Sequence, residues 1–124
     1  MAKRVFFSFD FDEDQTLKHH MVGQMKLPAS PFSGADWSMK EAAPQSNWES
    51  EAEARINRAD VVVVLLGNNT HKAPGVLKEV AITRRLGKPI VQIIGYKDSN
   101  PTAVPNAGRK LAWTWDNMSK VLAS

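Results

Sequence analysis

Val61-Val62-Val63-Val64-Leu65-Leu66 is the stretch of this sequence that decides its fold. Six consecutive branched apolar residues are typical of a central strand in a parallel sheet, which helices cover on both faces. The residues that follow, Gly67-Asn68-Asn69, favour a turn. The pattern therefore predicts a buried strand over 61–66 with a loop at its carboxyl end.

Helices are predicted on both sides of this strand along the chain. Ser46 and Glu49 have the spacing of a capping box, and the helix that they open carries its apolar residues on one stripe. After the strand, Pro74 suits a first helical position and Gly87 suits a helix stop. This spacing predicts a helix over 74–86.

The same alternation continues through the rest of the chain. The remaining predicted strands cover 5–9, 89–95 and 113–115, and the remaining predicted helices cover 15–26 and 116–123. Residues 27–45 are predicted to be mostly loop, which can include a short strand near 35–39. Such alternation predicts an α/β fold with a flavodoxin-like, doubly wound parallel sheet of about five strands. The strands 5–9, 61–66 and 89–95 are expected to be parallel neighbours in that order. A length of 124 residues fits one domain, so residues 1–124 are assigned to a single domain.

Composition excludes several classes of protein. The chain has no cysteine, which rules out disulfides, thiolate zinc sites and cysteine nucleophiles. No apolar run approaches the roughly 20 residues that a membrane-spanning helix needs, and the apolar stretch near the start is too short for a signal peptide. We therefore expect a cytoplasmic protein without a membrane partner.

Charge and histidine content narrow the ligand classes. Residues 1–60 hold seven Lys and Arg against ten Asp and Glu, whereas residues 61–124 hold nine against three. The basic half is compatible with an anionic ligand and equally with a solvated face. Aromatic residues are not interleaved with the basic ones, so no nucleic-acid partner is expected. Two of the three histidines are adjacent, so no metal site is expected either.

Strand ends are the expected place for a ligand. Doubly wound sheets bind ligands at the carboxyl ends of their strands, near the point where the strand order reverses. The glycine-rich phosphate motifs GxGxxG and GxxxxGK[ST] are both absent. The residues at these strand ends that are candidates for substrate binding are Ser8, Phe9, Asp10, Asp36, Trp37, Asn68, Thr70 and His71.

Structural roles compete with binding at several of these positions. Phe9 suits the core, and Asp10 can cap a helix. Turn chemistry accounts for Asn68, and capping accounts for Thr70. Trp37 is expected in a polar loop with little local packing, which favours a role in binding.

Glu79 is the candidate catalytic residue. On a helical projection it falls between Val76 and the apolar pair Ile82 and Leu86. A carboxyl group flanked by apolar groups can have a raised pKa, which is one mark of a functional carboxylate. The alternative is an ordinary surface glutamate whose carboxylate lies in water.

Several segments resemble the TIR-like domains of the Thoeris anti-phage type. The likeness covers the chain to about residue 116. The segments that carry it are Lys3 to Asp10 (KRVFFSFD), Asp36 to Ser38 (DWS), Ala59 to Gly67 (ADVVVVLLG), Asn69 to Glu79 (NTHKAPGVLKE) and Gln92 to Tyr96 (QIIGY).

The resemblance implies an activity as well as a fold. Enzymatic members of that family cleave the bond between nicotinamide and ribose in NAD, and their essential glutamate lies where Glu79 stands. NAD would then be a substrate, with no cofactor tightly bound. The product would be ADP-ribose or a cyclised nucleotide messenger that activates a separate effector protein.

The same resemblance assigns Asp36 and Trp37 to the region where TIR proteins place a mobile binding and assembly loop. Many TIR enzymes have a tryptophan four residues before the glutamate, where this chain has Gly75. An aromatic platform for nicotinamide would therefore come from Trp37, Phe9 or Trp48.

Two other functions stay open. A non-catalytic TIR-like module would assemble with itself or bind a nucleotide, and Gly75 favours it. An enzyme similar to nucleoside deoxyribosyltransferases would also use one carboxylate against a ribosyl centre, with Asp10 or Asp12 near the base.

Overall fold

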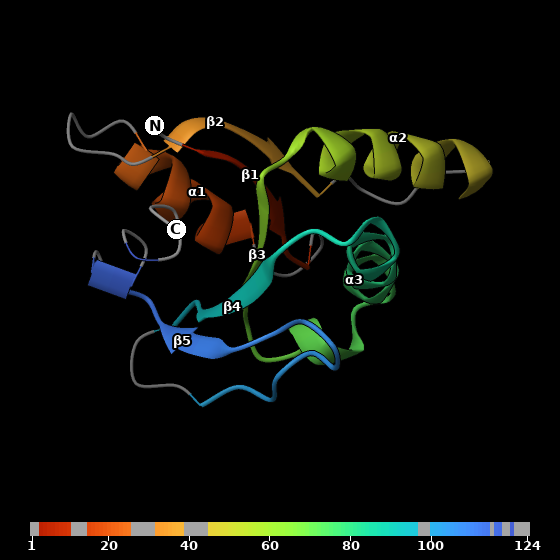
Figure 1. Cartoon of the computed structure of the whole chain (residues 1–124). Coiled ribbons are helices and arrows are strands. Elements are labelled where there is room, and N and C mark those ends of the chain that lie inside the picture. The colour runs from red at the N-terminus through yellow and green to blue at the C-terminus, as the bar shows by residue number, and fades with distance from the viewer. Residues whose placement is uncertain are drawn as a thin grey trace.

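A computed structural model describes residues 3–10, 15–25, 32–38, 45–96 and 100–114, together with 116, 117 and 120. Strands and helices alternate along these residues (Figure 1). The strands are β1 (Lys3–Ser8), β2 (Phe32–Trp37), β3 (Val61–Leu66), β4 (Ile90–Ile94) and β5 (Lys110–Ala112). The helices are α1 (Gln15–Met25), α2 (Gln45–Arg58) and α3 (Pro74–Leu86), with a 3₁₀ turn, η1 (Thr70–Lys72).

The five strands form one parallel sheet in the order β2-β1-β3-β4-β5. The predicted parallel neighbours β1, β3 and β4 are confirmed, and so is the flavodoxin-like class. The chain moves outward from β1 to β2 and then crosses back to β3, so the strand order reverses between β1 and β3. That switch point puts a natural crevice at the carboxyl ends of these two strands.

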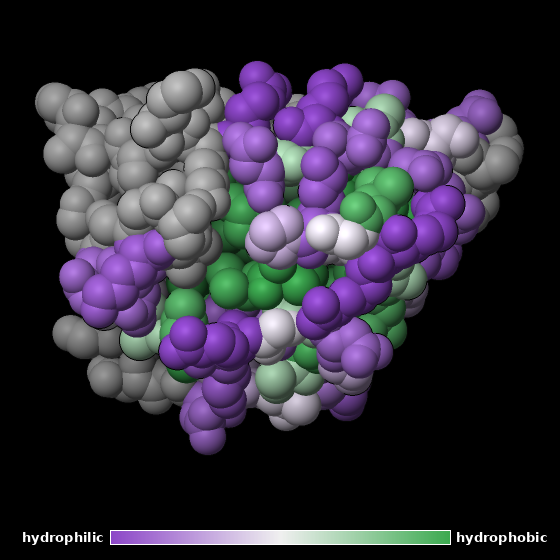
Figure 2. Space-filling view, in the orientation of Figure 1, coloured by the Kyte–Doolittle hydropathy of each residue, from purple (hydrophilic) through white to green (hydrophobic). Residues whose placement is uncertain are grey.

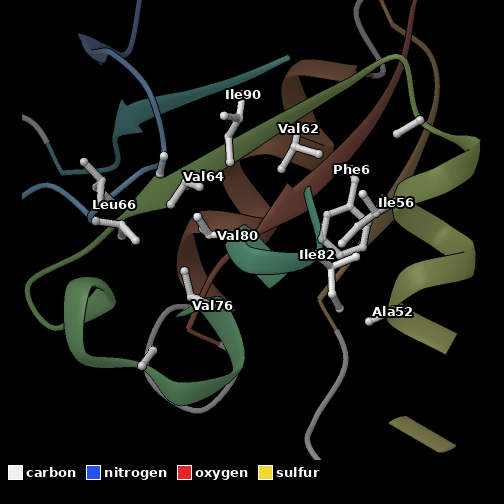
Figure 3. Packing of buried hydrophobic residues seen from close by; sticks show 14 of the residues in the cluster. Phe6, Ala52, Ile56, Val62, Val64, Leu66, Val76, Val80, Ile82 and Ile90 are labelled. Carbon is white, nitrogen blue, oxygen red and sulfur yellow. The ribbon is translucent and has the colours of Figure 1, made fainter. Parts of the chain in front are cut away.

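Helix α1 lies on one face of the sheet, and α2 and α3 lie on the other (Figure 1). Because successive residues of a strand point to opposite faces, Phe6 packs with α2 and α3 while Phe7 packs with α1. Figure 3 shows the larger layer, in which Phe6 and Val62 meet Ile56 of α2 and Ile82 of α3. On the opposite face, Leu17 and Met21 of α1 pack against β1, β3 and β4.

Two short strands differ from the predictions. β2 begins at Phe32 and ends at Trp37, so it starts before the predicted 35–39. The last strand is Lys110–Ala112 and not 113–115. The predicted helix over 116–123 lies largely outside the described residues.

Gln92 holds the segment between β4 and β5 to the sheet. This buried side chain donates to the Val104 and Gly108 carbonyls at 3.1 and 2.9 Å, and it accepts from the Val104 N–H at 2.7 Å. Gly108 has φ +80°, and a Cβ there would collide with the Ile90 carbonyl oxygen. The described part of the loop between β4 and β5 is therefore held against the sheet by these hydrogen bonds.

The ends of α3 follow the predicted signals, whereas α2 begins at Gln45, so Ser46 lies inside that helix and not at its cap. Pro74 opens α3, and Gly87 closes it with φ +68°, the left-handed conformation that glycine adopts easily. Within the described residues, every helix is too short or too polar to cross a membrane.

Candidate functional site

Glu79 lies in the second turn of α3 and is buried, with only 1% of its surface exposed. The alternative of a surface glutamate in water is therefore wrong. Helix α3 packs over the face of the sheet that carries Phe6, and Ser8 belongs to the same face because it lies two residues further along β1. Glu79 thus reaches the carboxyl end of β1, beside the switch point.

Two serine hydroxyls bind the same oxygen of Glu79. Ser8 Oγ donates to Glu79 Oε1 at 2.7 Å, and Ser38 Oγ donates to the same atom at 2.6 Å. Ser8 ends β1, and Ser38 comes directly after β2. Both serines are buried, at 0% and 5% exposure. The Glu79 carboxylate therefore lies at the carboxyl edge of the sheet, where it accepts hydrogen bonds from the ends of two strands.

Ser38 is also bound to the backbone of β1. Its Oγ accepts from the Phe9 N–H at 3.1 Å, and its own N–H donates to the Phe7 carbonyl at 3.0 Å. Sequence reasoning quoted this serine only as part of a motif and did not single it out. The parallel pairing of Phe7 with Trp37 places Ser38 beside Ser8, and this register is a tertiary feature that the local sequence does not show.

Trp37 does not lie in a loop, as the sequence suggested, but is the last residue of β2. Its ring stacks on Phe7 with centroids 4.5 Å apart and meets Phe9 edge-on at 6.3 Å. The Lys18 ammonium of α1 lies 5.5 Å from the ring centroid. These contacts place the Trp37 ring on the α1 face of the sheet, opposite the face that Glu79 contacts.

The aromatic platform expected for nicotinamide has few candidates on the Glu79 face. Phe9 is buried in the α1 layer, as the structural alternative for it predicted. Trp48 is buried between α2 and the sheet, with the Lys78 ammonium 5.8 Å from its ring centroid. Of these aromatic residues, Trp37 alone is partly exposed, and it faces α1.

The residues after β3 have local roles. Asn68 is exposed, whereas Thr70 is fully buried and its Oγ1 accepts from the Gly67 N–H at 2.7 Å. That bond closes the turn into η1. His71 is half-buried, and its Nδ1 has no hydrogen-bond partner among the residues that the structure describes.

Among the candidate residues at the strand ends, the structure joins Ser8 to Glu79 and directs the Trp37 ring to the other face of the sheet. Asp10 is half-buried at the end of β1. The Asp36 backbone pairs with Phe6, and its side chain lies outside the described residues.

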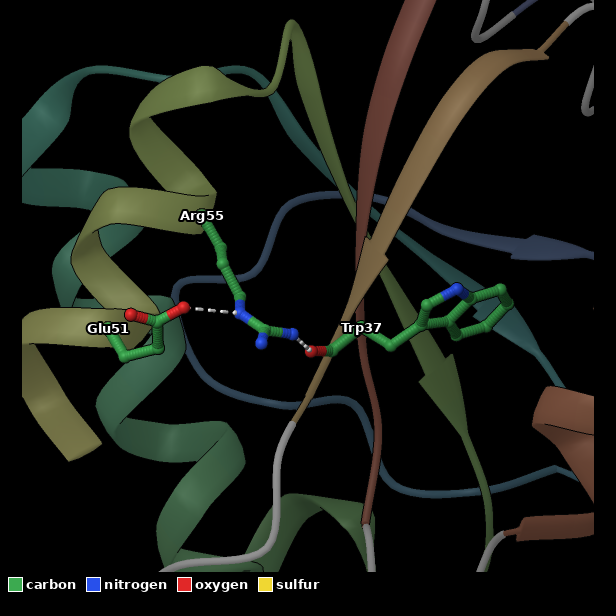
Figure 4. Close-up of polar contacts among 3 residues, drawn as sticks. All are labelled: Trp37, Glu51 and Arg55. Atoms are coloured by element: carbon green, nitrogen blue, oxygen red, sulfur yellow. Dashed lines mark hydrogen bonds and ion pairs between the residues drawn. The ribbon is translucent and has the colours of Figure 1, made fainter.

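Arg55 of α2 supports the end of β2 (Figure 4). Its Nε lies 3.2 Å from Glu51 Oε1, and its Nη1 donates to the Trp37 carbonyl at 3.4 Å. The i, i+4 spacing of Glu51 and Arg55 in α2 allows their ion pair, whereas the contact of Arg55 with Trp37 depends on how α2 packs beside β2. The contact matters because Trp37 immediately precedes Ser38.

A groove of about 500 Å³ lies elsewhere, between α2 and α3. Glu49 and Glu53 line it from α2, and Lys78 and Arg85 line it from α3, with an ion pair of 3.2 Å between Arg85 and Glu53. Figure 2 shows hydrophilic side chains over these helices and an apolar area at the centre of the same view.

Across the described part of the chain, no cluster of His, Asp and Glu could hold a metal ion.

A comparison with known protein families gave a match that agrees with the fold. The family model described as Thoeris protein ThsB, TIR-like domain, matches residues 6–100. A comparison with curated proteins gave no match. The matched segment contains Ser8, Ser38 and Glu79. Because the match spans most of the chain, this protein belongs to the family of TIR-like domains of the Thoeris protein ThsB, which serves anti-phage defence signalling.

Proposed function

We propose that this TIR-like domain cleaves the bond between nicotinamide and ribose in NAD, with Glu79 as the catalytic carboxylate. The observation that carries the proposal is the placement of Glu79 at the carboxyl end of β1, where hydroxyls from two strand ends hold it. Doubly wound sheets bind ligands at this switch point, so a nucleotide bound there would contact the Glu79 carboxylate.

The chemistry needs one carboxylate. Breaking the bond develops positive charge on the ribose, as in glycoside hydrolysis. A fixed negative charge facing that centre stabilises the transition state. Nicotinamide leaves as a neutral molecule, so no strong general acid is required. Water then forms the new bond to the ribose carbon and loses a proton, which gives ADP-ribose, or a nucleophilic atom of the same nucleotide forms that bond, which gives a cyclic product.

The proposal requires that NAD can reach the Glu79 carboxylate. Only 1% of Glu79 is exposed, so NAD binding or an activating event has to uncover the carboxylate. We therefore propose a low basal rate that rises at high protein concentration or with a phage-derived trigger. The product is an ADP-ribose-type nucleotide, linear or cyclic, that acts on a separate effector protein.

A non-catalytic module is the second candidate. Gly75, four residues before Glu79, does not supply the aromatic platform of many TIR enzymes, and burial of Glu79 between two serines also suits a structural role. Such a module would assemble with itself or bind a nucleotide without cleaving it. The deoxyribosyltransferase alternative needs a second aspartate near the base; Asp10 is half-buried, and Asp12 lies outside the described residues.

The test is incubation of concentrated protein with NAD, with both products separated by chromatography. The proposal predicts equal amounts of nicotinamide and an ADP-ribose-type product, and loss of both in Glu79→Gln. Glu49→Gln is the matched control, because Glu49 is exposed on α2. Absence of nicotinamide at every concentration, with and without trigger, would favour the non-catalytic module. Release of a free base from deoxynucleosides but not from NAD would favour the third candidate.

A further inference from the structure

We propose that Ser38 is a positioning residue for Glu79. Its effect on turnover rests on the proposed function, whereas the contact itself rests on geometry alone. Ser38 is buried, and its N–H donates to the Phe7 carbonyl at 3.0 Å, which continues the pairing of β2 with β1 by one residue. The side chain is therefore held at a fixed place beside β1.

The direction of its hydroxyl hydrogen is also fixed. The Phe9 N–H can only donate, so Ser38 Oγ must accept from it at 3.1 Å. A serine hydroxyl has one hydrogen, and two acceptors lie within reach of it: Glu79 Oε1 at 2.6 Å and the Phe7 carbonyl at 3.5 Å. The shorter contact has the length of a charge-assisted O–H to carboxylate bond, whereas the longer one exceeds the ordinary range. The hydrogen therefore points to Glu79.

Two donors from different strands restrict how the carboxylate can turn. With Ser8 alone, rotation of the carboxylate about its terminal bond would break one hydrogen bond. With Ser38 on the same oxygen at 2.6 Å, the same rotation breaks two, one to β1 and one to the end of β2. A carboxylate that stabilises charge only in the transition state gains from such preorganisation.

Helix α2 contributes through the residue before Ser38. Arg55 donates to the Trp37 carbonyl at 3.4 Å, and Glu51 orients the guanidinium at 3.2 Å (Figure 4). The end of β2 is thus bound to β1 on one side and to α2 on the other. This explains how a serine at a strand end keeps a defined position.

The kinetic test compares Ser38→Ala, Ser38→Thr and the control Ser50→Ala, an exposed serine of α2. Ser38→Ala should lower kcat for nicotinamide release by about tenfold or more, with KM changed by less than about threefold. Ser38→Thr, which keeps the hydroxyl, should recover part of the loss, and Ser50→Ala should match the parent. In the Glu79→Gln background, Ser38→Ala should have little further effect. Two results would overturn the proposal. One is an unchanged kcat in Ser38→Ala, and the other is a double variant whose loss in kcat equals the product of the losses in Ser38→Ala and Glu79→Gln.

A second measurement does not depend on activity. In a cycle of the parent, Ser38→Ala, Glu79→Ala and the double variant, urea unfolding should show coupling of about tenfold in the unfolding equilibrium constant, or about 1.4 kcal/mol. Should Glu79→Ala not fold, the Glu79→Gln background replaces it, with coupling of about threefold because the charge-assisted part is lost. If the effects of the two substitutions on the free energy of unfolding are additive, Ser38 and Glu79 are not coupled and the proposed contact is wrong. If the parent releases no nicotinamide, the proposed function fails and this cycle alone decides whether Ser38 holds Glu79.

Discussion

Replacing Glu79 with alanine should destabilise the protein far more than replacing it with glutamine. Both substitutions remove the buried negative charge, so the comparison between them cancels the cost of burying it. Glutamine keeps an acceptor oxygen for Ser8 and Ser38, which contact Oε1 at 2.7 and 2.6 Å. Alanine leaves two buried hydroxyls without that acceptor.

The expected difference in the free energy of unfolding follows from the hydrogen-bond partners of each serine hydroxyl. A buried polar group left without its partner costs about 1–3 kcal/mol. Two groups give about 2–6 kcal/mol, but Ser38 can turn toward the Phe7 carbonyl, which lies 3.5 Å away. We therefore expect Glu79→Ala to be less stable than Glu79→Gln by about 2–4 kcal/mol.

Urea unfolding followed by circular dichroism measures this difference directly. With an unchanged m value, the shift of the midpoint gives the change in unfolding free energy. Equal stability of the two variants would show that the serine hydroxyls do not depend on the carboxylate. That result would remove the geometric basis of the site.

Two further predictions concern the segment that joins β4 to β5. Gln92→Leu should lower the free energy of unfolding by about 2–4 kcal/mol, because it leaves the buried N–H and C=O of Val104 without their partner; an unchanged urea midpoint would contradict this. Gly108→Ala should cost about 2 kcal/mol or more, because φ is +80° and a Cβ would collide with the Ile90 carbonyl. Gly23→Ala is its control, since nothing lies within 4 Å of a Cβ at Gly23, and a thermal melt that ranks Gly108→Ala with the control would refute the collision.

The sheet could be predicted largely from sequence, for a physical reason. The residues of β3 are buried on both faces, so their composition alone marks a central strand. The capping signals at Pro74 and Gly87 are local as well, and they fixed the limits of α3. Such elements are encoded by neighbouring residues.

β2 was harder to predict because its sequence, FSGADW, has no β-branched residue and contains a glycine. It is a strand because it pairs with β1, and that pairing is a tertiary contact. The misplacement of Trp37 in a loop has the same origin. Once Trp37 ends a strand opposite Phe7, its ring has to lie on the α1 face.

The site itself depends on contacts between distant residues. Glu79 is 71 residues from Ser8 and 41 from Ser38 along the chain. A helical projection could show that Glu79 has apolar neighbours, but not that α3 carries it to the ends of β1 and β2. The role of Ser38 was missed because the sequence did not give the register of β2, and only this register brings the serine beside Ser8.

The central claim, that Glu79 is the catalytic carboxylate, is tested most directly by kcat and KM of Glu79→Gln for NAD. The substitution keeps the size of the side chain and its acceptor oxygen but removes the charge that faces the developing cation. Our account predicts that kcat for nicotinamide release falls by roughly 100-fold or more while KM changes little. A variant that releases nicotinamide as fast as the parent would contradict the account and place the catalytic group elsewhere.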